Sequence, residues 1–333
     1  MSRVAKPARL TLAGALAWVS AALALLCLAS LLIGAGEVGI LRSLSALAGA
    51  VDDEARFVLF ELRLPRTLLG VLVGVALGAA GVVLQAATRN PLAEPGLLGV
   101  SAGASFAVVV AISLGASAAT LNLGVAIAGA MAGCLLVLLV TQVRGVGDDP
   151  VRLVLAGAAF SGILTAISTL ILLHDQRSAD EIRFWIIGAL TGRPQDVLAW
   201  SAPGLLLLAP LIRPLAALAL GEKMATGLGH HPGLTRLGAL LGVAVLVGTA
   251  TAAAGPMAFV GLVVPFVARR LVGPDIRRTI GLSLLLGPII VLFADILSRL
   301  LVSPYELPIG VVTALIGAPV LITVVRSHRL PTL

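Results

Sequence analysis

The sequence predicts an all-α integral membrane protein that crosses the bilayer about ten times. Of its 333 residues, 59% are hydrophobic and 12% are charged, whereas soluble domains have about a quarter charged residues. The apolar residues form runs of roughly 17 to 25, the length that a helix needs to cross a hydrocarbon core. No linker or soluble domain interrupts these runs, so we expect residues 1–333 to form a single membrane domain.

The predicted spans follow the apolar runs and the polar breaks between them. Arg3, Lys6 and Arg9 precede the first run, as in a signal peptide, but this run is long for a signal core and predicts a retained span. The eighth run is short and opens on Gly255-Pro256. The spans are residues 10–34, 66–88, 96–115, 121–143, 152–173, 197–212, 235–254, 256–271, 280–302 and 308–326.

The distribution of basic residues predicts the orientation. An even number of spans places both termini on one side of the membrane. If that side is the cytoplasm, 15 of the 23 Lys and Arg residues lie inside and 8 lie outside. This asymmetry follows the positive-inside rule, so we predict that both termini are cytoplasmic.

Several classes of function are disfavoured by composition and motifs. The net charge is +7, but the basic residues lie in short breaks rather than in a stripe with aromatic residues, which argues against nucleic-acid binding. No G-x4-G-K-[ST] motif is present, so any ATP must be bound by another subunit. The spans contain no His, paired carboxylates or G-x-S-x-G motif, and no catalytic residue is predicted.

No metal site is predicted on this chain. Cys27 and Cys134 lie inside apolar runs, where a thiol behaves as a small hydrophobe. His230 and His231 lie in an inner loop without a Cys or carboxylate cluster, so we expect a solvated pair rather than a set of metal ligands.

Three glycines predict a close helix contact. Gly70, Gly74 and Gly78 recur every four residues and leave one face of the second span without side chains. We expect this face to pack against another helix of the chain, with a subunit interface as the alternative.

A series of motifs recurs in order over roughly residues 57–325. The motifs are Arg63-Leu64-Pro65-Arg66, Gln85, Arg89 to Ala104, Ala219 to Gly229, Gly255 to Pro265, Gly273-Pro274-Asp275, Asp295 to Arg299 and Glu306 to Pro319. In these motifs and their order, the sequence closely resembles the FecCD-type permeases of siderophore, haem and cobalamin importers. One departure is Phe266, where many relatives have a histidine after the Val-Pro pair.

The resemblance implies the permease subunit of a type II ATP-binding-cassette (ABC) importer in a bacterial inner membrane. It implies a separate cytoplasmic ATPase dimer, an extracytoplasmic binding protein, and a second permease copy or a paralogue that shares the pathway. The expected cargo is an iron-siderophore-type chelate, with haem or cobalamin as alternatives. ATP is bound by the partner subunit, and no cofactor is expected on this chain.

Three arginines are candidates for docking the binding protein. Arg63 and Arg66 flank Pro65 at the outer mouth of the second span, where the proline favours a helix start and both side chains can face outward. The resemblance implies that they receive carboxylates of the binding protein together with Arg299. Exposed ion pairs contribute only about 0.2 to 1 kcal/mol each, so we expect them to govern orientation and encounter rate. Anchoring at phospholipid headgroups is the alternative.

The inner loop at residues 213–234 is a candidate for ATPase coupling. Leu220, Met224 and Leu228 recur every four residues, which predicts a short surface helix. The resemblance implies a coupling helix in a cleft of the ATPase, with Gly221, Glu222, Ala225 and Gly229 at recurrent positions of the family. The alternative is an amphipathic helix that rests on the membrane.

Prolines within apolar sequence mark candidate helix breaks. Gly255, Pro256 and Pro265 leave backbone groups unpaired, which is tolerated where protein or a water-filled cavity satisfies them. They predict either a break near the transport pathway or a packing kink. Arg89 to Pro95 predicts a cytoplasmic turn between the second and third spans.

Carboxylates are scarce within the spans. Asp295 is four residues before Arg299 on one helix face, which predicts a structural ion pair. Glu306 is either an outer-mouth contact or a solvated carboxylate. Because ion-coupled transporters usually need titratable groups near the bilayer midplane, a secondary transporter is disfavoured.

Overall fold

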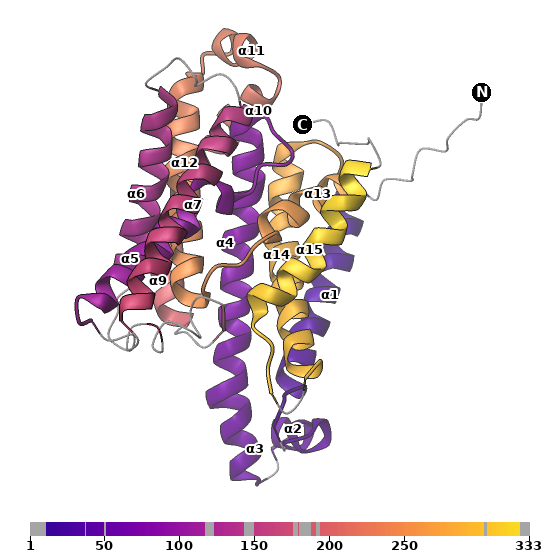
Figure 1. Ribbon diagram of the computed structural model, residues 1–333. Helices are drawn as coiled ribbons and strands as arrows, with labels where there is room; N and C mark the ends of the chain where they lie inside the picture. The colour runs from indigo at the N-terminus through magenta and orange to yellow at the C-terminus, as the bar shows by residue number, and fades with distance from the viewer. Residues whose placement is uncertain are drawn as a thin grey trace.

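The computed structural model describes residues 11–36, 38–49, 51–116, 123–142, 150–175, 179, 188–190, 194–302 and 305–326. Within these ranges the regular structure is entirely helical (Figure 1), which confirms the all-α fold class. Predicted basic positions 177, 183 and 193 of the outer side lie outside the described residues.

The helices are long enough to account for a membrane protein. Each predicted span overlaps a helix, although whether every one crosses the membrane stays a prediction. Six helical stretches of the described residues are long and apolar enough to do so: Leu12–Leu32, Asp53–Thr88, Leu155–His174, Asp196–Ala219, Pro232–Ala254 and Ile276–Leu300. The elements are α1 (Leu12–Leu32), α2 (Ile40–Leu47), α3 (Asp53–Phe57), η1 (Val58–Arg63), α4 (Leu64–Thr88), η2 (Pro95–Leu98), α5 (Val100–Ser113), α6 (Leu123–Gln142), α7 (Pro150–His174), α9 (Pro194–Leu208), η4 (Ala209–Leu211), α10 (Ile212–Ala219), α11 (Glu222–Gly227), α12 (Pro232–Ala254), α13 (Val260–Val272), α14 (Ile276–Leu300) and α15 (Ile309–Arg326).

The second predicted span belongs to a longer helix than expected. The expectation of a helix start at Pro65 is wrong, because α3, η1 and α4 run on continuously from Asp53 to Thr88. Pro65 has no N–H for the carbonyl four residues earlier, and the turns before it are π-helical, with the Leu64 N–H donating to the Leu59 carbonyl. The proline therefore accompanies a local widening of the helix rather than its start.

Helix α4 is the central element and is packed through glycine. A Cβ on Gly74 or Gly78 would collide with the backbone of α14, and a Cβ on Gly70 would collide with Leu292 of α14. The predicted packing of this glycine face within the chain is confirmed. Such close backbone approach stabilises helix pairs in a bilayer, where apolar burial alone gives little preference for protein contact.

The eighth predicted span is wrong in its first turn. Helix α12 ends at Ala254, and residues 255–259 are not helical. Gly255 and Phe259 both have positive φ, at 74° and 68°. Helix α13 then has only 13 residues, or about 20 Å at 1.5 Å per residue, which is shorter than the roughly 30 Å hydrocarbon core.

The break predicted at Gly255-Pro256 therefore exists, whereas Pro265 lies inside α13 without interrupting it. Pro265 cannot donate to the carbonyl of Gly261, four residues earlier. Gly81 of α4 lies directly against that carbonyl, where any larger residue would collide with it.

The two ends of the bundle carry different structures (Figure 1). The exposed helix α11 lies at one end, and α2 and α3 lie at the opposite end. The first turn of α1 and the last turn of α15 lie toward the α11 end. We call the α11 end the inner end and the α2–α3 end the outer end, following the predicted orientation.

Candidate functional site

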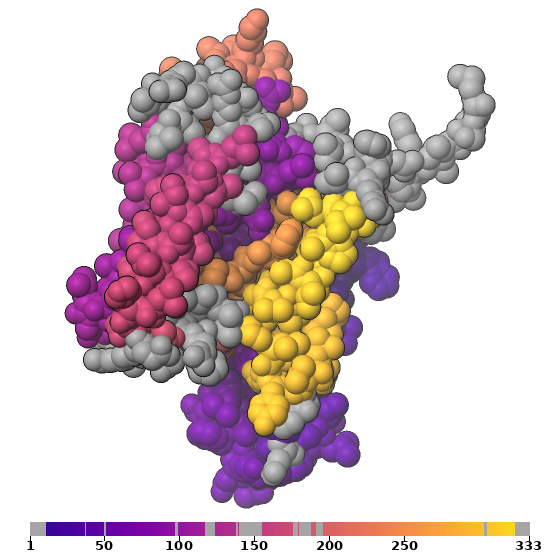
Figure 2. Space-filling view, in the orientation of Figure 1, coloured from indigo at the N-terminus to yellow at the C-terminus, as the bar shows by residue number. Residues whose placement is uncertain are grey.

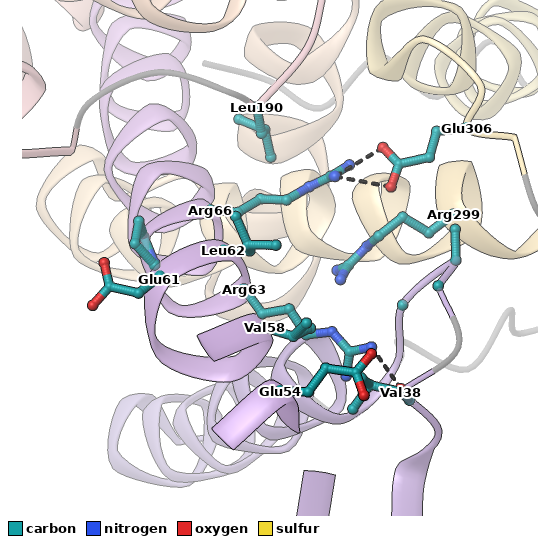
Figure 3. Close-up of a pocket in the computed structure, with 14 residues that line it drawn as sticks. Val38, Glu54, Val58, Glu61, Leu62, Arg63, Arg66, Leu190, Arg299 and Glu306 are labelled. Atoms are coloured by element: carbon teal, nitrogen blue, oxygen red, sulfur yellow. Dashed lines mark hydrogen bonds and ion pairs between the residues drawn. The ribbon is translucent and has the colours of Figure 1, made fainter. Parts of the chain in front are cut away.

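An open cavity of about 620 Å³ lies at the outer end, between the N-terminal part of the long helix and the segments that flank α14 and α15 (Figure 3). It brings together all three predicted docking arginines, although they are far apart in the sequence. Its lining residues are Gly34, Ala35, Gly36, Val38, Glu54, Val58, Glu61, Leu62, Arg63, Pro65, Arg66, Leu190, Arg299 and Glu306.

Arg66 joins two carboxylates in this cavity. Its Nε and Nη2 donate to Asp295 Oδ1 at 2.9 and 2.7 Å. Its Nη1 donates to both oxygens of Glu306, at 3.0 and 2.8 Å (Figure 3). Glu306 is thus a contact of the outer mouth within the chain. Paired donors in a planar fork fix the geometry of such contacts more strictly than a single ammonium could.

Asp295 lies between two arginines and is fully buried. Arg299 Nη2 donates to Asp295 Oδ2 at 2.7 Å, so the predicted pairing of these two residues is confirmed. Arg299 also donates through Nη1 to the carbonyls of Ser30 and Ile33, at 3.0 and 2.7 Å. The network therefore ties α1, α4 and α14 together at the outer end.

The expectation that Arg63 faces outward is wrong. Its side chain is 6% exposed and donates to the carbonyls of Leu31, Leu32 and Val38 and to Ser43 Oγ at 2.8 to 3.0 Å. A Cβ on Gly34 would collide with its guanidinium. Because neutral acceptors surround it, Arg63 holds the segment after α1 in place and presents no free donor face to the outside.

Arg299 is also buried, at 2% exposed. Among the three predicted docking arginines, Arg66 alone keeps a partly exposed side chain, at 19%. The environments of these arginines could not be predicted from the sequence, since the segment that covers Arg63 and Arg299 comes from the end of α1. Only the packed bundle brings that segment across them.

A second charge cluster lies beside the cavity, on α2 and α3. Arg42 donates to Asp52 at 2.9 and 3.0 Å and to Glu54 at 2.8 Å. The hydrogen bond from Arg42, aided by the Ala55 N–H, lowers the pKa of the Asp52 carboxyl, and the two carboxylates raise the pKa of Arg42. The ion pairs of Arg42 with Asp52 and Glu54, which we call the α2–α3 clip, hold α2 against the start of the long helix.

The surface helix at the inner end, α11, is shorter than the predicted one: it carries Met224, whereas Leu220 follows the last residue of α10 and Leu228 follows the last residue of α11. All three side chains are 54 to 68% exposed. Gly221 begins the helix with a φ of 118°, a value that favours glycine, and Gly229 follows its end with a φ of 81°.

Two other members of this predicted site hold α11 on the bundle. Ala225 is buried, so it supports the helix from below and cannot offer a contact surface. Glu222 forms an ion pair with Arg236 of α12, whose Nε donates to the Ala87 carbonyl of α4 at 3.3 Å. The base of α11 is thereby connected to the central helix.

Sequence reasoning missed one polar site in the interior. Glu94 accepts a hydrogen bond from the Phe259 N–H at the start of α13. Gln85 accepts one from Arg269 Nη2 and donates through Nε2 to the Ala93 carbonyl at 3.3 Å. The signal available in the sequence was a carboxylate between an alanine and a proline in otherwise apolar surroundings.

No group of three or more potential metal ligands occurs among the described residues. His231 is exposed and His230 is half-buried. Phe266 packs beneath the guanidinium of Arg270, with 4.9 Å from the Arg270 Cζ to the ring centroid.

Comparison with known proteins gives consistent results. A family model described as the FecCD transport family matches residues 22–327. The chain is 45% identical over 306 residues to the ferric enterobactin transport system permease protein FepD of Escherichia coli K12, covering 89% of this chain and 90% of FepD. It is 36% identical to the Fe(3+)-citrate import system permease protein YfmD of Bacillus subtilis 168, covering 90% of each.

A solved structure shares the fold. An inward-facing ABC transporter of metal-chelate type superposes with a TM-score of 0.77 at 30% identity, covering 94% of this chain and 98% of that chain. PsaBC from Streptococcus pneumoniae superposes with a TM-score of 0.59 at 17% identity and supports the fold alone.

Proposed function

Since this chain belongs to the FecCD transport family, as the match over residues 22–327 shows, we propose that it carries ferric siderophore chelates inward as one half of an ABC importer pathway. It is a multi-pass inner-membrane transport permease and not an enzyme. The observation that carries the proposed cargo is the 45% identity to the ferric enterobactin permease over nearly the whole chain.

Haem and cobalamin are less well supported as cargo. Relatives at 36 to 45% identity include permeases for ferric enterobactin, ferric citrate, ferric dicitrate and ferric hydroxamates. These ligands share a ferric ion enclosed by oxygen donors. An oxygen-donor ferric chelate is therefore the cargo class that we propose.

The inner end is our proposed ATPase interface. Helix α11 and the residues at its two ends expose three large apolar side chains, Leu220, Met224 and Leu228, and such a patch is typical of a surface that a partner covers. The Glu222–Arg236–Ala87 connection gives this surface a direct path to α4. The partner ATPase binds and hydrolyses the ATP, and cytoplasmic termini follow from the same orientation.

The outer end is our proposed surface for the extracytoplasmic binding protein. Arg66 is its accessible cation, and Arg63 and Arg299 support the surface from below instead of contacting the partner. Release of Glu306 would leave two donors of Arg66 free for an incoming carboxylate. A second copy of this chain, or a paralogue, completes the pathway.

The test is uptake into proteoliposomes that hold this chain with its ATPase subunit, with ATP trapped inside and binding protein outside. We expect ⁵⁵Fe uptake from a ferric catecholate or hydroxamate chelate that requires both ATP and binding protein. Uptake of labelled haem or cobalamin, without uptake of the ferric chelate, would show that the proposed cargo is wrong. Uptake that needs no ATP and collapses with the ion gradient would overturn the proposal.

A further inference from the structure

Two segments that interrupt the long helices meet inside the bundle. One is the loop of residues 89–99, which leaves the inner end of α4 and includes the short 3-10 helix η2, and the other is the break at residues 255–259 between α12 and α13. Pro95 packs against Gly261, and Gly261 packs against Gly81, two turns before the end of α4. The loop therefore folds back from the inner end into the bundle until it reaches the break.

Glu94 makes the polar contact between the two segments. Its Oε1 accepts the N–H of Phe259, the residue that precedes the first turn of α13. The first N–H groups of a helix have no partner within the helix, and a carboxylate there also interacts favourably with the helix dipole. Glu94 thus caps α13 from another part of the chain.

The far end of α13 is tied to the same loop. Arg269, in the last turn of α13, donates to Gln85, and Gln85 donates to the carbonyl of Ala93, next to Glu94. Arg269 and Gln85 are both buried. Helix α13 is therefore held at its N-terminal end by Glu94 and near its C-terminal end through Gln85, so that loop and helix form one connected block.

The break itself reaches the surface of the molecule. Ala258 is exposed, and Pro256, Met257 and Phe259 are partly exposed. Phe259 also packs against Gly317 of α15, where a Cβ would collide with it. Figure 2 shows this orange segment at the bottom of a hollow between the magenta helices and the yellow α15. If the loop of residues 89–99 and α13 moved together, the shape of the hollow at its bottom would change.

We propose that Glu94 is a positioning residue that locks the loop of residues 89–99 to the break at 255–259, so that the inner loop and α13 move as one body during transport. The role in transport rests on the proposed function, whereas the lock itself does not. Through this lock, a movement of the loop of residues 89–99 would displace residues 255–259, which line the hollow.

Hydrogen–deuterium exchange of the full chain in nanodiscs tests the lock without any cargo or partner. We expect Glu94→Ala to speed exchange of the Phe259 amide about tenfold or more, because a hydrogen bond to a charged group is lost. Glu94→Gln keeps the shape and an acceptor oxygen, so its exchange rate should lie between those of the wild type and Glu94→Ala.

Asp275→Asn is the matched control. The Asp275 carboxylate likewise caps a helix, accepting the Arg277 N–H at the start of α14 at 2.8 Å, but it does not contact the break. We expect it to leave exchange at residues 255–262 unchanged. Unchanged exchange in Glu94→Ala, or an equal increase in Asp275→Asn, would overturn the proposal.

A second measurement tests the role in transport. In proteoliposomes with the ATPase, we expect Glu94→Ala to lower uptake per ATP hydrolysed, Glu94→Gln to restore part of it, and Asp275→Asn to leave the ratio unchanged. An unaltered ratio in Glu94→Ala would refute the transport role. If the wild type itself transports no ferric chelate, the proposed cargo fails, and the exchange experiment still decides the lock.

Discussion

The outer and inner ends of the bundle differ in whether the side chains of their candidate sites are covered by the rest of the chain. At the outer end, Arg63 and Arg299 are buried and Arg66 is mostly enclosed, with each guanidinium bonded to the chain itself. At the inner end, Leu220, Met224 and Leu228 are exposed on and beside α11. The outer end is thus a preformed platform whose charges are paired within the chain, whereas the inner end exposes the apolar side chains that we propose as the ATPase interface.

The most severe test of the preformed platform is Asp295→Ala. It leaves Arg66 and Arg299 without their shared buried counter-charge, and loss of one partner of a buried pair costs about 3–5 kcal/mol. We expect a loss of that size in the free energy of unfolding, measured by denaturant titration in detergent micelles.

Glu54→Ala is the control for that experiment, since Glu54 forms an ion pair on the exposed side of the same cavity. We expect it to change the free energy of unfolding by less than about 0.5 kcal/mol. If Asp295→Ala were equally mild, the buried network would not hold the outer end together.

Because Leu220 and Leu228 are exposed, replacing them should weaken binding of the ATPase subunit without lowering the stability of the fold. We expect the double variant Leu220→Ser, Leu228→Ser to bind the ATPase subunit about tenfold more weakly or worse, because burial of one leucine side chain stabilises by about 1.5–3 kcal/mol. Binding to immobilised ATPase measures the affinity, and thermal unfolding checks the fold. Leu114→Ser, just after the end of α5, removes a leucine that is even more exposed and should have no effect on either.

Glu306→Gln removes the charge that pairs with Arg66, so that the outer end, like the inner end, presents a group without a partner in the chain. We expect the free energy of unfolding to fall by only about 0.2–1 kcal/mol, since this ion pair is partly exposed. Association with an acidic binding protein should become faster and more salt-dependent, as stopped-flow mixing at two ionic strengths would show. An unchanged association rate would mean that Arg66 is not the accessible cation.

The smallest expected effect is a pH dependence of the α2–α3 clip. Because Arg42 lowers the pKa of Asp52 from its ordinary 3.8, ionised Asp52 stabilises the fold above about pH 4. This contribution is lost as the pH falls through the lowered pKa. The difference in melting temperature between the wild type and Asp52→Asn should therefore shrink between about pH 6 and pH 3. A constant difference in melting temperature would mean that the charge of Asp52 does not contribute to the stability of the fold.

Much of the fold was accessible to prediction because bilayer crossing imposes a simple length rule. Helices lie at all the apolar runs, and the glycine face of α4 was correctly expected to pack within the chain. The prolines were harder to interpret. Pro65, Pro256 and Pro265 look alike in sequence, yet they accompany a π-helical turn, a true break and an uninterrupted helix, respectively.

The candidate sites were predicted to different degrees for a similar reason. The stripe on α11 is a local pattern, and local spacing was sufficient to predict it. Burial of Arg63 and Arg299 depends on the end of α1, about thirty residues and more than two hundred residues away, respectively. The contact of Glu94 with Phe259 spans 165 positions and ends on a backbone N–H, which no residue type reveals.

The sequence alone determined the fold class, the family, the placement of the helices and the exposed stripe of the inner helix, since these depend on hydrophobic length, local periodicity and motif order. Tertiary structure alone decided which arginine reaches solvent, where the helix breaks and what caps α13. Those features depend on which distant backbone groups and side chains share a buried volume, and burial sets whether a charge acts as a support or as a contact.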